Sequence, residues 1–265
     1  MKKASLFLVI SPALFNIAGA ATVANWKEFN TDAAVVPISD ANTDSPVFGN
    51  GVTPNSAQAA WIAGQFGTTG SPGSVTLAVG DTLTVSGGLT LTGGTNNSGQ
   101  FRFGVFNDGG QFAADDGSNW TSGWLHVIGT GDASDLFQGR TNGAFISTGA
   151  NAVDLNSVVT RSGAFDGDSV TPFSFSMTIT RDSATTLDVV SLITGGDGGY
   201  SEQYVEDDIT TANFTYTAAG LLFGGSAGLE KASFSGVQYE VTSVPEPSSA
   251  LLGLAGLLIG FVRRR

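Results

Sequence analysis

The sequence contains no cysteine, and it has a single histidine among 265 residues. Without cysteine the chain can form neither a disulfide framework nor a thiolate metal site, so its stability must come from its core alone. One histidine is too few for a typical zinc centre. Any Ser-His-Asp triad would have to use His126. These absences argue against zinc and thiol chemistry.

Charged residues are also scarce, at 13% of the chain, and acidic residues outnumber basic ones by 23 to 11. Five of the basic residues stand near the two ends, in segments predicted below to be removable. The domain between them is therefore more acidic than the formal net charge of −12 suggests. Phosphate backbones repel such a surface, so nucleic acid is not an expected partner.

The first twenty residues have the order of parts found in a secretory signal peptide. Two lysines follow Met1, residues 6–15 are mostly apolar, and small residues then provide an A-x-A cleavage site. We expect cleavage after Ala20, with Ala21 as the alternative. The residues assigned to this site are Ala18, Ala20 and Ala21. The chain is therefore expected to be exported.

Alternation of apolar and polar residues dominates the middle of the chain, which has 37 glycines and 18 phenylalanines. Residues 173–180 alternate most clearly, and residues 186–193 are predicted to pair with them across a turn. Residues 81–85 and 89–92 flank Gly87-Gly88 and predict a hairpin or meander. Further strands are predicted at 23–29, 59–63, 75–79, 101–105, 124–128, 136–137, 144–147, 214–217, 221–223 and 234–241.

Many short strands with glycine-rich turns, and no 3.6-residue period between them, predict one all-β domain over residues 21–243. An antiparallel two-sheet sandwich is the simplest way to bury these strands. The pattern of long alternating strands is similar to the concanavalin-like jelly roll of lectins, laminin-G modules and glucanases. No internal repeat or domain boundary is visible.

Candidate catalytic residues are few. Sandwiches that cut glycans use paired carboxylates, and an E-x-D-x-E strand would place alternate carboxylates on one face. No such run is present. Glu202 and Glu206 fall in a stretch predicted to be a loop, where they form a solvated pair. His126 shares a strand face with Trp124, and it is either a base or sugar contact or a hydrogen-bonded strand histidine.

Binding candidates come from aromatic and acidic side chains. Trp120 and Trp124 bracket a polar turn and either stack on a sugar or belong to the core. No cofactor is required, but acidic loops offer oxygen ligands that suit calcium. The calcium candidates are Asp115, Asp116, Asp166 and Asp168, with further acidic loops at Asp108, Asp132 and Asp135. Short Thr-x-Thr repeats leave an ice-binding surface as a minor alternative.

The last twenty-two residues form three distinct parts. Pro245 and Pro247 enclose Glu246 and keep the backbone extended. Residues 250–262 carry no charge and predict a short membrane-anchor helix. Three arginines end the chain and are expected to stay in the cytoplasm. The residues of this segment that define the signal are Val244, Pro245, Glu246, Pro247, Arg263, Arg264 and Arg265.

This arrangement over residues 244–265 resembles a PEP-CTERM sorting signal, which exosortases recognise in Gram-negative bacteria that make exopolysaccharide. The resemblance implies export, transient anchoring in the inner membrane and transfer to the cell surface or extracellular matrix. We therefore expect a non-catalytic surface protein associated with exopolysaccharide. A lectin-like, calcium-dependent carbohydrate-binding module is the alternative; a glycan-active enzyme or an ice-binding protein is less favoured.

Overall fold

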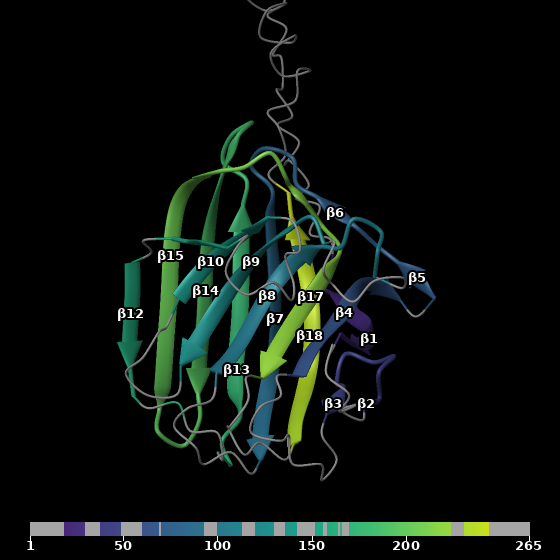
Figure 1. Ribbon diagram of the computed structural model, residues 1–265, viewed down its shortest axis with the longest axis vertical. Coiled ribbons are helices and arrows are strands. Elements are labelled where there is room, and N and C mark those ends of the chain that lie inside the picture. Colours follow the sequence, from purple (N-terminus) through teal and green to yellow (C-terminus); the bar gives the residue numbers. More distant parts are fainter. Residues whose placement is uncertain are drawn as a thin grey trace, which may run out of the picture.

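The computed structural model describes residues 19–29, 38–48, 60–68, 70–92, 100–112, 120–129, 136–141, 152–155, 158–163, 165, 170–223 and 231–243. Every regular element in these residues is a β-strand (Figure 1), and all pairings between strands are antiparallel. The predicted all-β class is confirmed. None of the described residues forms a helix long and apolar enough to span a membrane.

The strands form two sheets. Sheet A contains, in spatial order, β12 (Val158–Ser162), β15 (Tyr200–Thr210), β14 (Thr186–Gly195), β13 (Phe173–Thr180), β7 (Thr82–Thr92) and β18 (Lys231–Thr242). Sheet B contains β11 (Ala152–Asp154), β10 (Leu136–Thr141), β9 (Ser122–Gly129), β8 (Gln100–Asn107), β17 (Ala218–Phe223), β4 (Ala60–Thr68) and β1 (Ala21–Glu28).

Short strands complete the domain at its margins. They are β2 (Ile38–Ser39) and β3 (Val47–Phe48) beside β18, β5 (Ser71–Pro72) beside β4, and the pair β6 (Val75–Thr76) and β16 (Thr215–Tyr216). In Figure 1, β12 and β15 stand at one side of the molecule, and β1, β2, β3 and β5 stand at the other.

Strand β1 belongs to both sheets. Its first residues, Ala21 and Thr22, pair with β18 in sheet A, whereas the ladder with β4 in sheet B begins at Val23. A bulge follows Ala24, where Asn25 has a φ of 55°. Asparagine tolerates this left-handed conformation better than most residues, and a bulge bends its strand. The strand can therefore cross from one sheet to the other.

Most of the core lies between the two sheets. On β13, Phe173, Phe175, Met177 and Ile179 are buried, while the intervening hydroxyl residues face outward, as the alternation predicts. The β13–β14 hairpin is also confirmed. Trp26 of β1 stacks on Phe234 of β18 with ring centroids 6.2 Å apart. Burial of these side chains is the main source of stability in a chain without disulfides.

A second cluster lies on the opposite face of sheet B. Strands β8 and β9 turn Phe106, Leu125 and Val127 away from the space between the sheets, and Phe29 and Phe112 pack over them together with Trp120. Phe29 meets both Phe112 and Trp120 edge to face, with ring centroids 5.2 Å apart in each pair. Among the described residues, the outer face of sheet B is thus covered over β8 and β9.

Two predicted segments differ from the structure. Strand β7 continues through Gly87 and Gly88, so the predicted hairpin there is wrong; Gly88 pairs with Ser174 on one side and Ser235 on the other. A side chain at Gly87 would be 2.8 Å from the Phe175 ring, so glycine here serves packing within the sheet. The loop predicted around Glu202 is wrong as well, because these residues belong to β15.

Other strand predictions have mixed outcomes. Only Val75–Thr76 of the predicted strand 75–79 pairs with another strand, and the segment at 136–137 extends to Thr141. The strand predicted at 144–147 lies outside the described residues.

The contact between Gly64 and Trp26 provides a test of the core. A methyl group at Gly64 would lie 2.7 Å from the Trp26 ring and from Val23, so both neighbours would have to shift. We expect Gly64→Ala to lower the free energy of unfolding by about 1–3 kcal/mol. Urea denaturation measures it. Thr92→Ala, at an exposed position, should change stability by less than about 0.5 kcal/mol, and equal effects of the two variants would contradict this packing.

Candidate functional site

A hydrogen-bonded polar cluster connects the two sheets through the only histidine of the chain. His126 of β9 contacts Ser191 of β14 and Glu202 of β15, with Nδ1 2.9 Å from Ser191 Oγ and Nε2 2.9 Å from Glu202 Oε1. All three residues are 0% exposed. Since β9 belongs to sheet B and β14 and β15 belong to sheet A, these contacts cross the core.

The second carboxylate oxygen of Glu202 is also occupied. The Tyr200 hydroxyl donates a hydrogen bond to Oε2, and Nε of Arg161 on the edge strand β12 lies 3.8 Å from the same oxygen. The ring of Tyr204 meets the His126 ring edge to face, with centroids 4.8 Å apart. Glu202 is therefore a buried carboxylate with hydrogen-bond partners on both oxygens, the arrangement that a buried charge requires.

These partners determine the ionisation of Glu202. Burial by itself would raise the pKa of this carboxyl group, because it disfavours the charged form. Hydrogen bonds from His126 and Tyr200, together with the positive charges of His126 and Arg161, act in the opposite direction, and the pKa of Glu202 is lowered below its ordinary value. The network therefore stabilises the ionised carboxylate.

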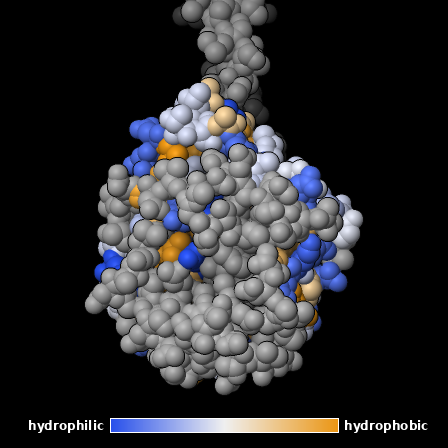
Figure 2. All heavy atoms as spheres, viewed as in Figure 1, coloured by the Kyte–Doolittle hydropathy of each residue, from blue (hydrophilic) through white to orange (hydrophobic). Residues whose placement is uncertain are grey.

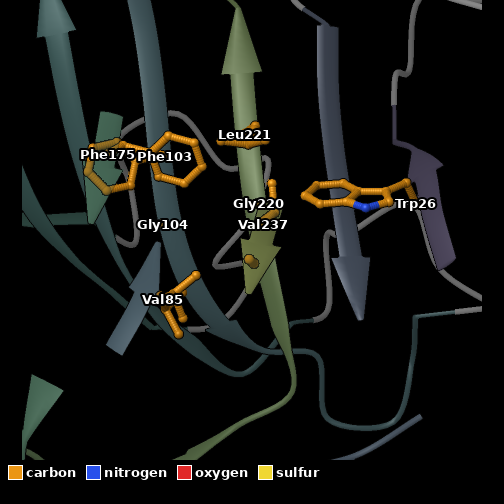
Figure 3. Close-up of a pocket in the computed structure, with 10 residues that line it drawn as sticks. Trp26, Val85, Phe103, Gly104, Phe175, Gly220, Leu221 and Val237 are labelled. Atoms are coloured by element: carbon orange, nitrogen blue, oxygen red, sulfur yellow. The ribbon is translucent and has the colours of Figure 1, made fainter. Parts of the chain in front are cut away.

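Ser191, His126 and Glu202 are residue types that occur in hydrolase triads, but their position excludes contact with a substrate in this structure. The space beside them is filled by Phe103 and Tyr204. A nearby cavity between the sheets, lined by Trp26, Val85, Phe175 and their neighbours (Figure 3), has a volume of only about 10 Å³. That volume holds one water at most. The network is a structural connection between the sheets.

Two sequence predictions are settled by this geometry. His126 is a hydrogen-bonded strand histidine, the structural alternative of the two considered. The prediction of a solvated Glu202–Glu206 pair is wrong, because Glu202 points into the core and bonds His126. Strand alternation from Tyr200 would have placed Glu202 inward, but the glycines and acidic residues around this stretch suggested a loop.

Both tryptophans proposed as glycan contacts lie in the core. Trp120 is 0% exposed in the cluster over sheet B, and Trp124 is 8% exposed between the sheets. Trp124 Nε1 donates to the Tyr216 hydroxyl at 3.0 Å, and burial raises the pKa of that tyrosine. Neither indole ring is open to a sugar, so the predicted glycan contact at these residues is wrong, and the core alternative holds.

The predicted calcium candidates Asp115, Asp116, Asp166 and Asp168 lie outside the described residues, as do Asp132 and Asp135. Asp108 is described, and it is buried. Its Oδ1 accepts hydrogen bonds from the Gly110 amide and the Thr217 hydroxyl, each at 2.9 Å. This carboxylate fixes the turn after β8 and joins it to Thr217, which lies between β16 and β17.

A different group of carboxylates is brought together at one end of sheet A. Oxygens of Asp182, Asp188 and Asp208 all lie within 4.8 Å of one another. Asp188 stands at a bulge between β14 and β15, where its Oδ1 accepts from the Asp208 amide at 2.9 Å. The sequence does not indicate this group, because its members are separated by a turn and by the length of two strands.

The outer face of sheet A is rich in hydroxyl groups. Thr82 and Thr180 are 3.0 Å apart between their hydroxyl oxygens, and Thr84 and Thr178 are 3.2 Å apart, so these threonines bond each other across β7 and β13. Further along the same strands a shallow groove of about 490 Å³ opens. Its polar lining comes from Ser86, Ser174, Ser176, Thr194, Ser235 and Gln238.

The surface shows no broad apolar area among the described residues, where Val79 and Val170 are the only large apolar side chains that are exposed. Figure 2 shows hydrophilic residues in blue on either side of one face of the domain, with small hydrophobic areas in orange. The groove on sheet A combines its polar side chains with the apolar side chains of Phe175 and Leu192.

The two ends assigned to targeting are only partly described. Ala20 and Ala21 are described, with β1 beginning at Ala21, whereas Ala18 and the sorting residues 244–265 lie outside the described part.

Residues 224–228 read Gly-Gly-Ser-Ala-Gly and fit the G-x-S-x-G consensus of a nucleophile elbow. These residues lie outside the described part of the chain, between β17 and β18.

Comparison with known proteins identifies the C-terminal segment. The family of the PEP-CTERM protein-sorting motif matches residues 243–265, so the chain carries this motif. The predicted sorting signal is confirmed, and with it an exported protein that is sorted through the membrane to the cell surface by exosortase processing. No curated protein matches the chain.

Solved structures similar to the domain are legume-lectin-like jelly rolls. Lectin II from Ulex europaeus is 11% identical, with 84% of this chain and 96% of that chain covered and a TM-score of 0.42. The carbohydrate recognition domain of Emp47p is 12% identical over 88% and 100% of the two chains, with a TM-score of 0.46. The legume lectin-like domain from Entamoeba histolytica is 11% identical over 83% and 90%, with a TM-score of 0.41.

The buried network predicts a large cost for removing its carboxylate. Glu202→Ala leaves His126 and the Tyr200 hydroxyl buried without their acceptor, and we expect the free energy of unfolding to fall by about 3–5 kcal/mol. Glu206→Ala, four residues along the same strand, is the matched control and should cost about 1 kcal/mol or less. Chemical denaturation of both variants measures the difference, and similar losses would contradict the network.

The same carboxylate predicts a pH dependence of stability. Since the folded pKa of Glu202 is lowered, its ionised form stabilises the fold above the ordinary pKa of about 4.3, and this contribution is lost as pH falls through the lower folded value. Glu202→Gln does not titrate, so its Tm should fall less than that of the wild type between about pH 5 and about pH 3. A Glu206→Gln control should keep the wild-type dependence; an unchanged dependence in Glu202→Gln would contradict the assignment.

Proposed function

We propose that this chain is a non-catalytic protein of the cell surface or extracellular matrix, associated with the exopolysaccharide of a Gram-negative bacterium. The observation that carries the proposal is the sorting motif at residues 243–265, which follows directly after the last strand of the domain, β18. The folded domain is thereby the part delivered to the surface. An exosortase is the processing partner, and residues 250–262 hold the intermediate in the inner membrane.

Support for a non-catalytic role comes from where the reactive side chains lie. The only histidine of the chain and Glu202 are 0% exposed and bond each other in the core. The described residues that line the groove on sheet A carry hydroxyl and amide groups beside Phe175 and Leu192, and they include no carboxylate pair of the kind that glycoside hydrolysis uses. A cofactor has no role in this proposal.

A carbohydrate-binding module is the second candidate, favoured by the same groove. Hydroxyl and amide groups can exchange hydrogen bonds with sugar hydroxyls, and the uncharged lining suits a ligand without charge. Calcium dependence rests on the acidic loops outside the described residues and stays a prediction. The two candidates are compatible, because a protein held in a polysaccharide matrix can be retained there by binding it.

The sorting part of the proposal predicts the ends of the mature protein. Mass spectrometry of protein recovered from the native cell surface should find termini near Ala21 and near Pro245. Replacing the motif residues, as in Pro245→Ala with Pro247→Ala, should leave the tail uncut and move at least about tenfold less protein to the surface, because the grip on the extended segment is lost.

A Ser249→Ala variant, which alters the polar spacer before the apolar run, serves as the control and should be processed normally. Recovery of surface protein that still ends in Arg263–Arg265 would contradict exosortase processing. Release of new reducing ends from exopolysaccharide by the purified chain would contradict the non-catalytic role.

A further inference from the structure

We propose that the groove on the outer face of sheet A binds an uncharged polysaccharide, laid across strands β18, β7, β13 and β14. This inference rests on the proposed function, which it extends by naming the site and the class of ligand. Strand register places two adjacent rows of side chains side by side along the groove. They are Gln238–Ser86–Ser176–Leu192 and Ser235–Gly88–Ser174–Thr194.

The hydroxyl groups of the groove differ from those of the threonine pairs beside them. The hydroxyl groups of Thr82 and Thr84 form hydrogen bonds with those of Thr180 and Thr178, respectively. Among the described residues, no hydrogen bond engages the side chains of the groove residues Ser86, Ser174, Ser176 and Gln238. Their donors and acceptors therefore stay available to a ligand with hydroxyl groups, whereas the threonine pairs largely satisfy themselves.

The hollow exists because glycine takes the place of a side chain at two points. Gly88 sits on the outer face, where a methyl group would lie 2.4 Å from Ser235 Oγ and would displace that hydroxyl group. Gly236, with a φ of 57°, forms the bulge of β18 and has open space around its missing side chain. A glycine on a strand lets another molecule approach the backbone closely.

Charge determines which polysaccharide fits. No ionisable residue is among the described residues that line the groove, although the chain as a whole carries a formal net charge of −12. The neighbouring outward position on β18 is Glu240, paired with Thr84. A polyanion would meet this acidic surface without any cation in the groove to hold it, whereas a neutral chain avoids the repulsion. The lining therefore favours an uncharged ligand.

The geometry also predicts a preference for polymers. Four strands spaced about 4.8 Å apart give a path of about 14 Å across the sheet, longer than one sugar ring. The groove offers no exposed aromatic platform, so each sugar is held by a few hydrogen bonds whose individual contributions are small. Affinity then comes from several sugars held at once, and a monosaccharide should compete poorly.

The test uses the full-length chain with two neutral polymers, dextran and a soluble β-glucan, and with alginate as a polyanion. The groove variant is Ser86→Ile combined with Ser176→Ile, two directly paired residues, and it replaces two hydroxyls with larger apolar groups that favour strands. Thr92→Ile, at the exposed end of β7, is the control. Affinity electrophoresis measures binding, and thermal unfolding checks that each variant is folded.

We expect a neutral polymer to bind the wild type and the Thr92→Ile control equally, and the groove variant to bind at least about tenfold more weakly. Gln238→Ala, a single change at an exposed position, should weaken binding by about two- to tenfold. Unchanged binding in the folded groove variant would overturn the site. Preference for alginate, or binding of none of the polymers, would overturn the uncharged ligand.

These outcomes are separable from the test of the proposed function. Surface protein with mature termini but no polymer binding in the groove would remove this inference and leave the sorting and the non-catalytic role intact. Groove-dependent binding by a protein that is not processed at its tail would support this inference and contradict the sorting by an exosortase.

Discussion

The contact between His126 and Glu202 is the interaction on which the arrangement of the two sheets depends. It joins residues that are 76 positions apart in sequence and belong to different sheets. Apolar burial pushes the sheets together without requiring particular partners, whereas the hydrogen bond between His126 and Glu202 joins one atom of each sheet to a defined partner. Ser191, Tyr200 and Arg161 then hold the pair from three strands of sheet A.

The buried polar cluster contrasts with the polar groups on the outer face of sheet A. His126 and Glu202 are buried and bond each other in the core. The groove on the outer face of sheet A presents hydroxyl groups, one amide group and glycine backbone, with Leu192 beside them. On sheet B, Phe112 and Trp120 cover part of the outer face among the described residues. The outer faces of the two sheets therefore differ in the described residues: aromatic side chains pack on that of sheet B, and hydroxyl groups predominate on that of sheet A.

The sequence predicts those features that depend on local pattern. Strict alternation identified β13 and β14 and their hairpin, and the order of proline, apolar and arginine segments identified the sorting motif. Prediction from the sequence failed where a glycine or a charged residue contacts a residue that is distant in the sequence. Gly87 looks like a turn residue until Phe175 is seen beneath it, and Glu202 looks solvated until His126 is brought opposite to it. The groove depends on the register of four strands, which single-strand patterns do not reveal.

The position of β18 has a mechanical consequence. This strand pairs with β7 along almost its whole length and with β1 near its end, and the sorting segment follows it directly. A force applied through the tail would therefore act first on β18, whose ladder hydrogen bonds with β7 run from Lys231 to Thr242 with one bulge. The strand that adjoins the sorting motif is thus one that is paired on both sides, with β7 and with β1, and not a free edge.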